Sequence, residues 1–238
     1  MIRDDLQTLG EIGSLLGGAT IDALGLPKDC RRLVRAGYDA CADAYAEVRA
    51  GDDPDQIAPL LEVLPDGSSI LDLGCGAGIP IARALSTRYR ITGVDTSRIM
   101  LGLAEANVPE ARFIHGDVLD VELGPSSFDA AAAIFVVFHL PREEHGRLFE
   151  RVRRWLRPGG YFLISLTQDG ESARIRHDFF GTDMYWSRMG FAESMKLLEG
   201  LGFEVVRERI VVHGYGHTAI ERDERNPLTL VRKPSSEP

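Results

Sequence analysis

The sequence predicts an α/β protein built on a doubly wound, largely parallel sheet. Two patterns indicate this fold class. From residue 70 onward, short apolar runs alternate with stretches of helical length and amphipathic spacing. The runs are apolar throughout, as in parallel strands that helices cover on both faces. Turn-forming segments such as Arg157-Pro158-Gly159-Gly160 separate helix from strand at the places where a doubly wound sheet needs them.

The expected elements follow this alternation in order. Ahead of the sheet, amphipathic stretches predict helices at Asp4–Leu16, Lys28–Val48 and Pro54–Leu64. Apolar runs predict strands at Ile70–Leu73, Ile91–Val94, Arg112–His115, Ala130–Phe138 and Tyr161–Ser165. Helices are expected between most of them, at Ile79–Thr87, Ser97–Asn107 and Arg142–Leu156. A helix at Glu193–Leu201 and two strands complete the edge of the sheet, at Phe203–Val212 and Leu228–Arg232.

The chain therefore divides into a helical extension or cap, residues 1–64, and a sheet-bearing core, residues 65–238. At 238 residues it is long enough for one such core. Within the core, residues 166–190 break the alternation and form an insert after the fifth strand. This insert is a candidate lid or substrate wall because it contains an aromatic cluster, Phe179, Phe180, Tyr185 and Trp186.

Composition limits the classes of partner. Acidic residues outnumber basic ones 36 to 27, which gives a formal charge of −9 and argues against binding a nucleic acid. Three cysteines at no metal-ligand spacing favour a reducing, cytoplasmic location and predict no metal site. The longest apolar run, Ala130–Phe138, is far shorter than the ~18 residues that span a membrane, so no membrane anchor is expected.

A glycine loop after the first strand is the sharpest motif. The strand Ile70–Leu73 leads into Gly74-Cys75-Gly76-Ala77-Gly78, where glycine lets a ligand approach the backbone. Dinucleotide-binding proteins share such loops, so a nicotinamide-dependent oxidoreductase is an alternative. Their fingerprint has a third glycine where this chain has Ile79, and Asp72 beside the loop suits an amino group better than a pyrophosphate.

Two further acids follow the next strands. Asp95 ends the second strand about twenty residues after the first loop glycine, where a carboxylate can accept both hydroxyls of a ribose. Asp95 could instead cap the following helix, a role for which Ser97 competes. Asp117 follows the third strand and is a candidate acceptor for an adenine amino group, or else a turn residue.

Together these motifs resemble a class I S-adenosylmethionine-dependent methyltransferase. The resemblance covers roughly residues 36–165 and includes the loop, Asp95–Leu101, Gly116-Asp117, Phe128-Asp129 and Leu156–Gly160. It implies a Rossmann-like sheet of seven strands with the last antiparallel. It further implies that Asp72 and the loop face the methionine end of the cofactor, Asp95 the ribose, Met100 the adenine face, and Asp117 with Val118 the adenine edge.

The segment from Tyr38 to Tyr45 resembles the helix that many small-molecule methyltransferases fold over the cofactor. The two tyrosines would then border the methionine end, although seven residues apart on a helix they could equally form a core stripe. The complete set of expected cofactor contacts is Tyr38, Tyr45, Asp72, Gly74, Cys75, Gly76, Gly78, Asp95, Thr96, Met100, Gly116, Asp117, Val118 and Ile134.

The predicted activity is methyl transfer from S-adenosylmethionine to a small, partly apolar acceptor, with secondary metabolism as one setting. Alignment and exclusion of water can accelerate this reaction without a base. If a base is used, His139 after the fourth strand is the candidate, because His145 is expected at the surface. The insert should supply the acceptor contacts His177, Tyr185 and Trp186. A protein that binds the cofactor without transferring its methyl group is the other alternative.

Overall fold

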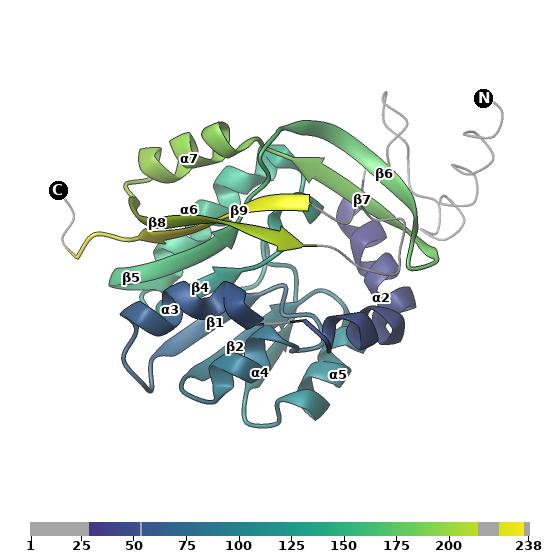
Figure 1. The fold of residues 1–238 in the computed structure, drawn as a ribbon, viewed down its shortest axis with the longest axis horizontal. Coiled ribbons are helices and arrows are strands. Elements are labelled where there is room, and N and C mark those ends of the chain that lie inside the picture. Colours follow the sequence, from purple (N-terminus) through teal and green to yellow (C-terminus); the bar gives the residue numbers. More distant parts are fainter. Residues whose placement is uncertain (1–28, 53, 214–223, 236–238) are drawn as a thin grey trace.

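A seven-stranded mixed sheet forms the centre of the computed structural model, which describes residues 29–52, 54–213 and 224–235 (Figure 1). The strand order is β3-β2-β1-β4-β5-β9-β8. Both β5 and β8 pair with β9 in antiparallel fashion, so the predicted seven strands with the last one antiparallel are confirmed. The strands are β1 (Ser69–Leu73), β2 (Arg90–Asp95), β3 (Arg112–His115), β4 (Phe128–Ala133), β5 (Leu156–Ser165), β8 (Glu204–His213) and β9 (Glu224–Arg232).

Helices cover both faces of the sheet because successive strand residues point to opposite sides. On β1, Ile70 packs in the cluster beneath α3 (Ala58–Val63) and α4 (Ile81–Ser86). Its neighbour Leu71 packs in the opposite cluster, beneath α6 (His145–Trp155) and α7 (Phe191–Gly200). A further helix, α5 (Arg98–Asn107), follows β2 and packs against β3. This arrangement is the doubly wound fold that the apolar runs predict.

A cap lies over one end of the sheet and consists of α2 (Cys30–Arg49) and a hairpin formed by β6 (Glu171–Phe179) and β7 (Thr182–Arg188) (Figure 1). Gly37 allows α2 to approach β7 closely, since a Cβ atom at this position would lie 2.9 Å from the Asp183 carbonyl oxygen. The hairpin was not predicted as strands, because its pairing is irregular at two places and its residues do not alternate cleanly. No helix of the described residues is long and apolar enough to cross a membrane.

The structure corrects two expectations about the fourth strand and the helix after it. The predicted strand Ala130–Phe138 ends at Ala133, because Phe135 has a left-handed backbone (φ 60°) and its N–H donates to Ser165 Oγ at 2.5 Å. His145, the first residue of α6, is only 1% exposed and its ring packs beside Phe149 of the same helix, so it is not a surface residue.

The predicted helices agree more closely with the structure. The predicted helix Pro54–Leu64 is a 3₁₀ turn, Pro54–Ile57, followed by α3. The predicted helix Lys28–Val48 matches α2 closely. The predicted helix Asp4–Leu16 lies outside the described residues.

Candidate active site

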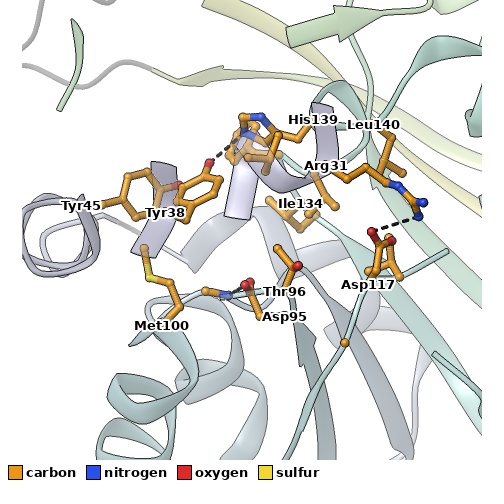
Figure 2. Close-up of a pocket in the computed structure, with 17 residues that line it drawn as sticks. Arg31, Tyr38, Tyr45, Asp95, Thr96, Met100, Asp117, Ile134, His139 and Leu140 are labelled. Atoms are coloured by element: carbon orange, nitrogen blue, oxygen red, sulfur yellow. Dashed lines mark hydrogen bonds and ion pairs between the residues drawn. The ribbon is translucent and has the colours of Figure 1, made fainter. Parts of the chain in front are cut away.

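A cleft opens at the carboxyl ends of the central strands, beneath α2 (Figure 2). It lies where β1 has β2 on one side and β4 on the other, the switch point at which open α/β sheets bind ligands. A narrower cavity shares four lining residues with it and extends it toward Asp72. The predicted residues that line the cleft are Tyr38, Tyr45, Gly74, Gly76, Asp95, Thr96, Met100, Gly116, Asp117, Val118, Ile134 and His139. Asp72 and Cys75 line the narrower cavity.

The three glycines of the loop all adopt left-handed backbone conformations, with φ of 63° at Gly74, 53° at Gly76 and 75° at Gly78. A Cβ atom at Gly76 would meet nothing within 4 Å, so this residue leaves open space for a ligand. Gly78 lines neither cavity, and a Cβ atom there would lie 3.3 Å from Ala104 Cα. Gly78 therefore serves the packing of the loop on α5 and is not placed for the cofactor contact expected from sequence.

Asp72 is the least satisfied polar group of the site. Its side chain is 3% exposed, and Oδ2 has no hydrogen-bond partner among the described residues. Burial, and after it the charge of Asp95, raise the pKa of Asp72 to about 7. A buried carboxyl without a partner is costly, and a cationic ligand would repay that cost. The residues present thus fit the ammonium group at the methionine end of S-adenosylmethionine.

The carboxylate of Asp95 is held in place by backbone donors from both sides. Oδ2 accepts the N–H of Gly76 and Oδ1 accepts the N–H of Ser97, each at 2.8 Å. Burial raises the pKa of Asp95 despite these hydrogen bonds. Ser97, not Asp95, caps α5, because Ser97 Oγ accepts the N–H of Met100 at 3.1 Å. Each oxygen of Asp95 retains a lone pair, as an acceptor of ligand hydroxyls requires.

Asp117 faces the cleft at the end of β3 and is paired with a residue that sequence reasoning missed. Arg31 Nη1 of α2 donates to Asp117 Oδ2 at 3.2 Å and to Asp120 Oδ2 at 2.9 Å, as the dashed line to Asp117 in Figure 2 shows. Asp117 Oδ1 accepts the N–H of Leu119 at 2.8 Å. Arg31 therefore links the start of α2 to the edge of the cleft. No local sequence pattern predicts this pairing, because Arg31 and Asp117 are 86 residues apart.

Arg49, at the other end of α2, was also missed. Its side chain is 6% exposed and lines the narrower cavity together with Asp72. The guanidinium forms an ion pair of 2.5 Å with Asp52 and lies 5.7 Å from the centre of the Phe135 ring. A guanidinium beside a carboxyl presents opposite charges to a ligand, which suits the carboxylate and ammonium groups of an amino acid.

Tyr38 and His139 meet on the opposite side of the cleft from Asp95, Thr96 and Met100 (Figure 2). The Tyr38 hydroxyl lies 2.8 Å from His139 Nε2, and His139 Nδ1 lies 3.1 Å from the carbonyl oxygen of Tyr185. Burial lowers the pKa of His139 to about 4, so the ring is neutral near pH 7.

The expected acceptor contacts from the insert do not line the cleft. His177 is 57% exposed and pairs with Asp183 at 2.8 Å. Trp186 is buried behind the cleft wall, where its ring stacks on Phe138 and lies 4.8 Å from the His139 ring. Tyr185 is buried too and contributes its backbone carbonyl to His139. The hairpin thus supports the wall from behind, which corrects the expectation of direct contact.

Within residues 29–52, 54–213 and 224–235, no group of three or more His, Cys, Asp or Glu side chains is arranged to hold a metal ion.

Comparisons with known proteins agree with this geometry. A family model described as "Methyltransferase domain" matches residues 70–160. An uncharacterized methyltransferase of Synechocystis is 28% identical over 154 residues, which cover 62% of this chain and 72% of that protein. A tRNA (carboxymethyluridine(34)-5-O)-methyltransferase of Arabidopsis thaliana is 30% identical over 141 residues, 59% of this chain but only 34% of that protein.

A solved structure with a similar fold is the 1,6-didemethyltoxoflavin-N1-methyltransferase of Burkholderia thailandensis, which holds 1,6-didemethyltoxoflavin and S-adenosylhomocysteine. The TM-score is 0.68 at 21% identity, over 91% of this chain and 94% of that one. The ordered motifs, the family model and the fold agree. Together they support a class I S-adenosylmethionine-dependent methyltransferase whose cofactor is S-adenosylmethionine.

Proposed function

We propose that this methyltransferase acts on a small, partly apolar acceptor. The observation that supports this most directly is the covered cleft. Beyond its acidic residues the lining is mostly apolar, and α2 lies across it. Such a lining, with a few polar groups, is typical of small-molecule sites. The apolar lining residues are Val34, Met100, Val118, Ile134, Phe135, Val136 and Leu140.

The residues proposed to hold the cofactor occupy the cleft from end to end. Asp72 and Arg49 would bind the ammonium and carboxylate groups at the methionine end. Asp95 would accept the ribose hydroxyls, and Asp117 with Val118 would face the adenine edge. The remaining proposed contacts are the loop residues Gly74 and Gly76, together with Tyr38, Tyr45, Thr96, Met100, Gly116 and Ile134. When bound, the cofactor supplies an electrophilic methyl group on a sulfonium.

The chain's own contribution is alignment and the exclusion of water. The loop and Asp95 fix one side of the cleft through backbone hydrogen bonds, and α2 closes the other. Aromatic rings of Tyr38 and Tyr45 line the cleft and can stabilise a nearby cation by about 0.5–2 kcal/mol. A covered, apolar site strengthens such interactions because little water competes.

The test is to measure formation of S-adenosylhomocysteine with three kinds of acceptor. We would offer a library of small molecules, unmodified tRNA and short peptides to the full chain. We expect turnover with small molecules alone, because the net charge of −9 opposes the binding of an RNA. Methylation of tRNA or peptides in preference to every small molecule would refute the proposal. Binding of S-adenosylmethionine with no transfer to any acceptor would instead favour a cofactor-binding role without methyl transfer.

A further inference from the structure

We infer that Asp39 of α2 is a positioning residue for the cofactor, which acts through Ser97 to hold Asp95 where it accepts the ribose hydroxyls. This inference rests on the part of the proposed function that assigns the ribose to Asp95. It goes beyond that assignment, because Asp39 lines neither the cleft nor the narrower cavity. The covering helix would then take part in recognition of the ribose through a side chain that does not touch it.

The link from Asp39 begins at the hydroxyl group of Ser97. Ser97 is fully buried at the start of α5, and its hydroxyl donates to Asp39 Oδ1 at 2.6 Å. A carboxylate can only accept, so the direction of this hydrogen bond is fixed. A buried hydroxyl that has no acceptor is costly, and Asp39 therefore determines how the Ser97 side chain is turned. The same oxygen of Asp39 lies 3.5 Å from the backbone nitrogen of Ile99.

Ser97 in turn contacts two residues that line the cleft. Its Oγ accepts the N–H of Met100 at 3.1 Å, and its own backbone N–H donates to Asp95 Oδ1 at 2.8 Å. Because the hydroxyl proton points to Asp39, a lone pair of Oγ remains for the Met100 N–H. One buried serine thus connects the covering helix with the proposed ribose acceptor and with the residue proposed to face the adenine.

The attachment of α2 explains why the effect should be specific for the ribose. The helix packs against α5 and is tied to the rest of the cleft at two places (Figure 1). Arg31 pairs with Asp117 at the proposed adenine edge, and Asp39 bonds Ser97 beside Asp95. Loss of Asp39 would leave the contact at the adenine edge intact. Only the contact beside the proposed ribose acceptor would be released.

The charge of Asp39 opposes the charge of Asp95. Burial raises the pKa of Asp95 against the hydrogen bonds from Ser97 and Gly76, and the charge of Asp39 raises it further. A neutral oxygen acceptor in place of Asp39 would bond the Ser97 hydroxyl without this repulsion. The hydrogen bond, and not the negative charge, is therefore the property of Asp39 that should hold Asp95 in place.

The experiment measures how strongly the protein distinguishes a ribose from a sugar without its hydroxyls. The probes are 5′-methylthioadenosine and its 2′,3′-dideoxy analogue, and calorimetry gives the affinity of the full chain for each. Both probes lack an ammonium group, so Asp72 does not contribute. The parent should bind the first probe about 30-fold more tightly, because hydrogen bonds to a carboxylate are missing in the second. In Asp39→Ala and in Ser97→Ala this ratio should fall to about threefold.

The ratio separates positioning from folding, because a partly unfolded protein would lose affinity for both probes equally. Asp39→Asn keeps an oxygen that accepts the Ser97 hydroxyl, so its ratio should stay within about twofold of the parent. The double variant that combines Asp39→Ala with Ser97→Ala should match Ser97→Ala alone, since both residues act along one path. The matched control is Asp43→Ala, one turn further along α2 and exposed, which should keep the ratio of the parent.

Each outcome supports the inference or overturns it. An unchanged ratio in Asp39→Ala, an equal loss in Asp39→Asn, or losses that multiply in the double variant would overturn it while the ribose assignment stands. That assignment is tested by Asp95→Ala, in which the two probes should bind about equally. If the parent does not distinguish the probes, or Asp95→Ala still does, the ribose assignment fails and the inference fails with it. None of these measurements uses a methyl acceptor, so the proposal of a small-molecule acceptor is tested separately.

Discussion

Replacement of Asp72 by Asn should stabilise the cofactor-free protein against unfolding. The same replacement should weaken the affinity of the protein for the cofactor. Burial and the charge of Asp95 raise the pKa of Asp72 from 3.8 to about 7 in the folded chain. A carboxyl with a raised pKa favours folding only while it is protonated. Its contribution is therefore fully present below pH 3.8 and is lost as pH rises through about 7. The full shift corresponds to an upper limit of about 4 kcal/mol at pH 8.

Asn has nearly the same shape and no charge at any pH, so Asp72→Asn should remove this cost. Thermal or urea unfolding without cofactor should show the variant more stable than the parent at pH 8, by up to about 4 kcal/mol, and nearly equal at pH 4. Affinity for S-adenosylhomocysteine should fall about 10- to 150-fold, because a charge-assisted hydrogen bond of about 1.5–3 kcal/mol is lost. Calorimetry in two buffers at pH 6 should show proton release on binding by the parent alone.

The opposite signs of these two effects make the reasoning refutable. A residue that only maintains the fold would lower stability and affinity together. The exposed Asp43 of α2 provides the control, since Asp43→Asn should change neither quantity. An Asp72→Asn protein that is less stable than the parent at pH 8, or that binds the cofactor with unchanged affinity, would show that Asp72 does not hold a cation.

Two further predictions concern Asp95 and His139. Asp95→Ala should weaken binding of S-adenosylhomocysteine on the order of tenfold or more, because charge-assisted hydrogen bonds to ribose are lost; calorimetry on the folded variant tests this, and unchanged affinity would refute the ribose assignment. The lowered pKa of His139, about 4 against 6.5, predicts stability that is present above pH 6.5 and lost as pH falls toward 4, by about 3 kcal/mol. Unfolding midpoints between pH 7 and 4 should fall more steeply in the parent than in His139→Asn, and parallel curves would contradict the assignment.

The sheet and one side of the cleft could be predicted from the sequence because their signals are local. Asp72 is the next-to-last residue of β1, Asp95 ends β2 and Asp117 follows β3, so the topology alone brings them to one edge. The fold places all three at the two adjoining cavities. The cofactor roles assigned to them remain predictions until binding is measured.

The α2 side of the cleft was harder to predict, since its contacts join residues far apart in the chain. Arg31 meets Asp117 across 86 residues, and Tyr38 meets His139 across 101. The apolar run after Ala133 resembles a strand because periodicity cannot distinguish a strand from an apolar cleft wall. Its left-handed Phe135 depends on Ser165, which comes from another strand.

The two tryptophans of the chain offer a matched test of how the hairpin contributes to function. Trp155, in α6, is 2% exposed and belongs to the core cluster on that face of the sheet, and Trp186, in β7, is 6% exposed and belongs to the cluster within the cap. Neither tryptophan lines the cleft or the narrower cavity. Ala at either position should therefore cost roughly 3 kcal/mol of stability through lost packing.

Only Trp186 contacts the His139 ring, at 4.8 Å, and only its loss frees that ring to turn away from Tyr38. At a temperature where both variants are folded, Trp186→Ala should therefore lower kcat at least tenfold while cofactor affinity stays within threefold. Trp155→Ala should keep both values. Steady-state rates and calorimetry on the two proteins measure these quantities directly. Normal turnover in folded Trp186→Ala would show that the hairpin only stabilises the cap, whereas an equal loss in Trp155→Ala would attribute the effect to general destabilisation. Because the two substitutions remove the same side chain from equally buried positions, the difference between them isolates the support that Trp186 gives to His139.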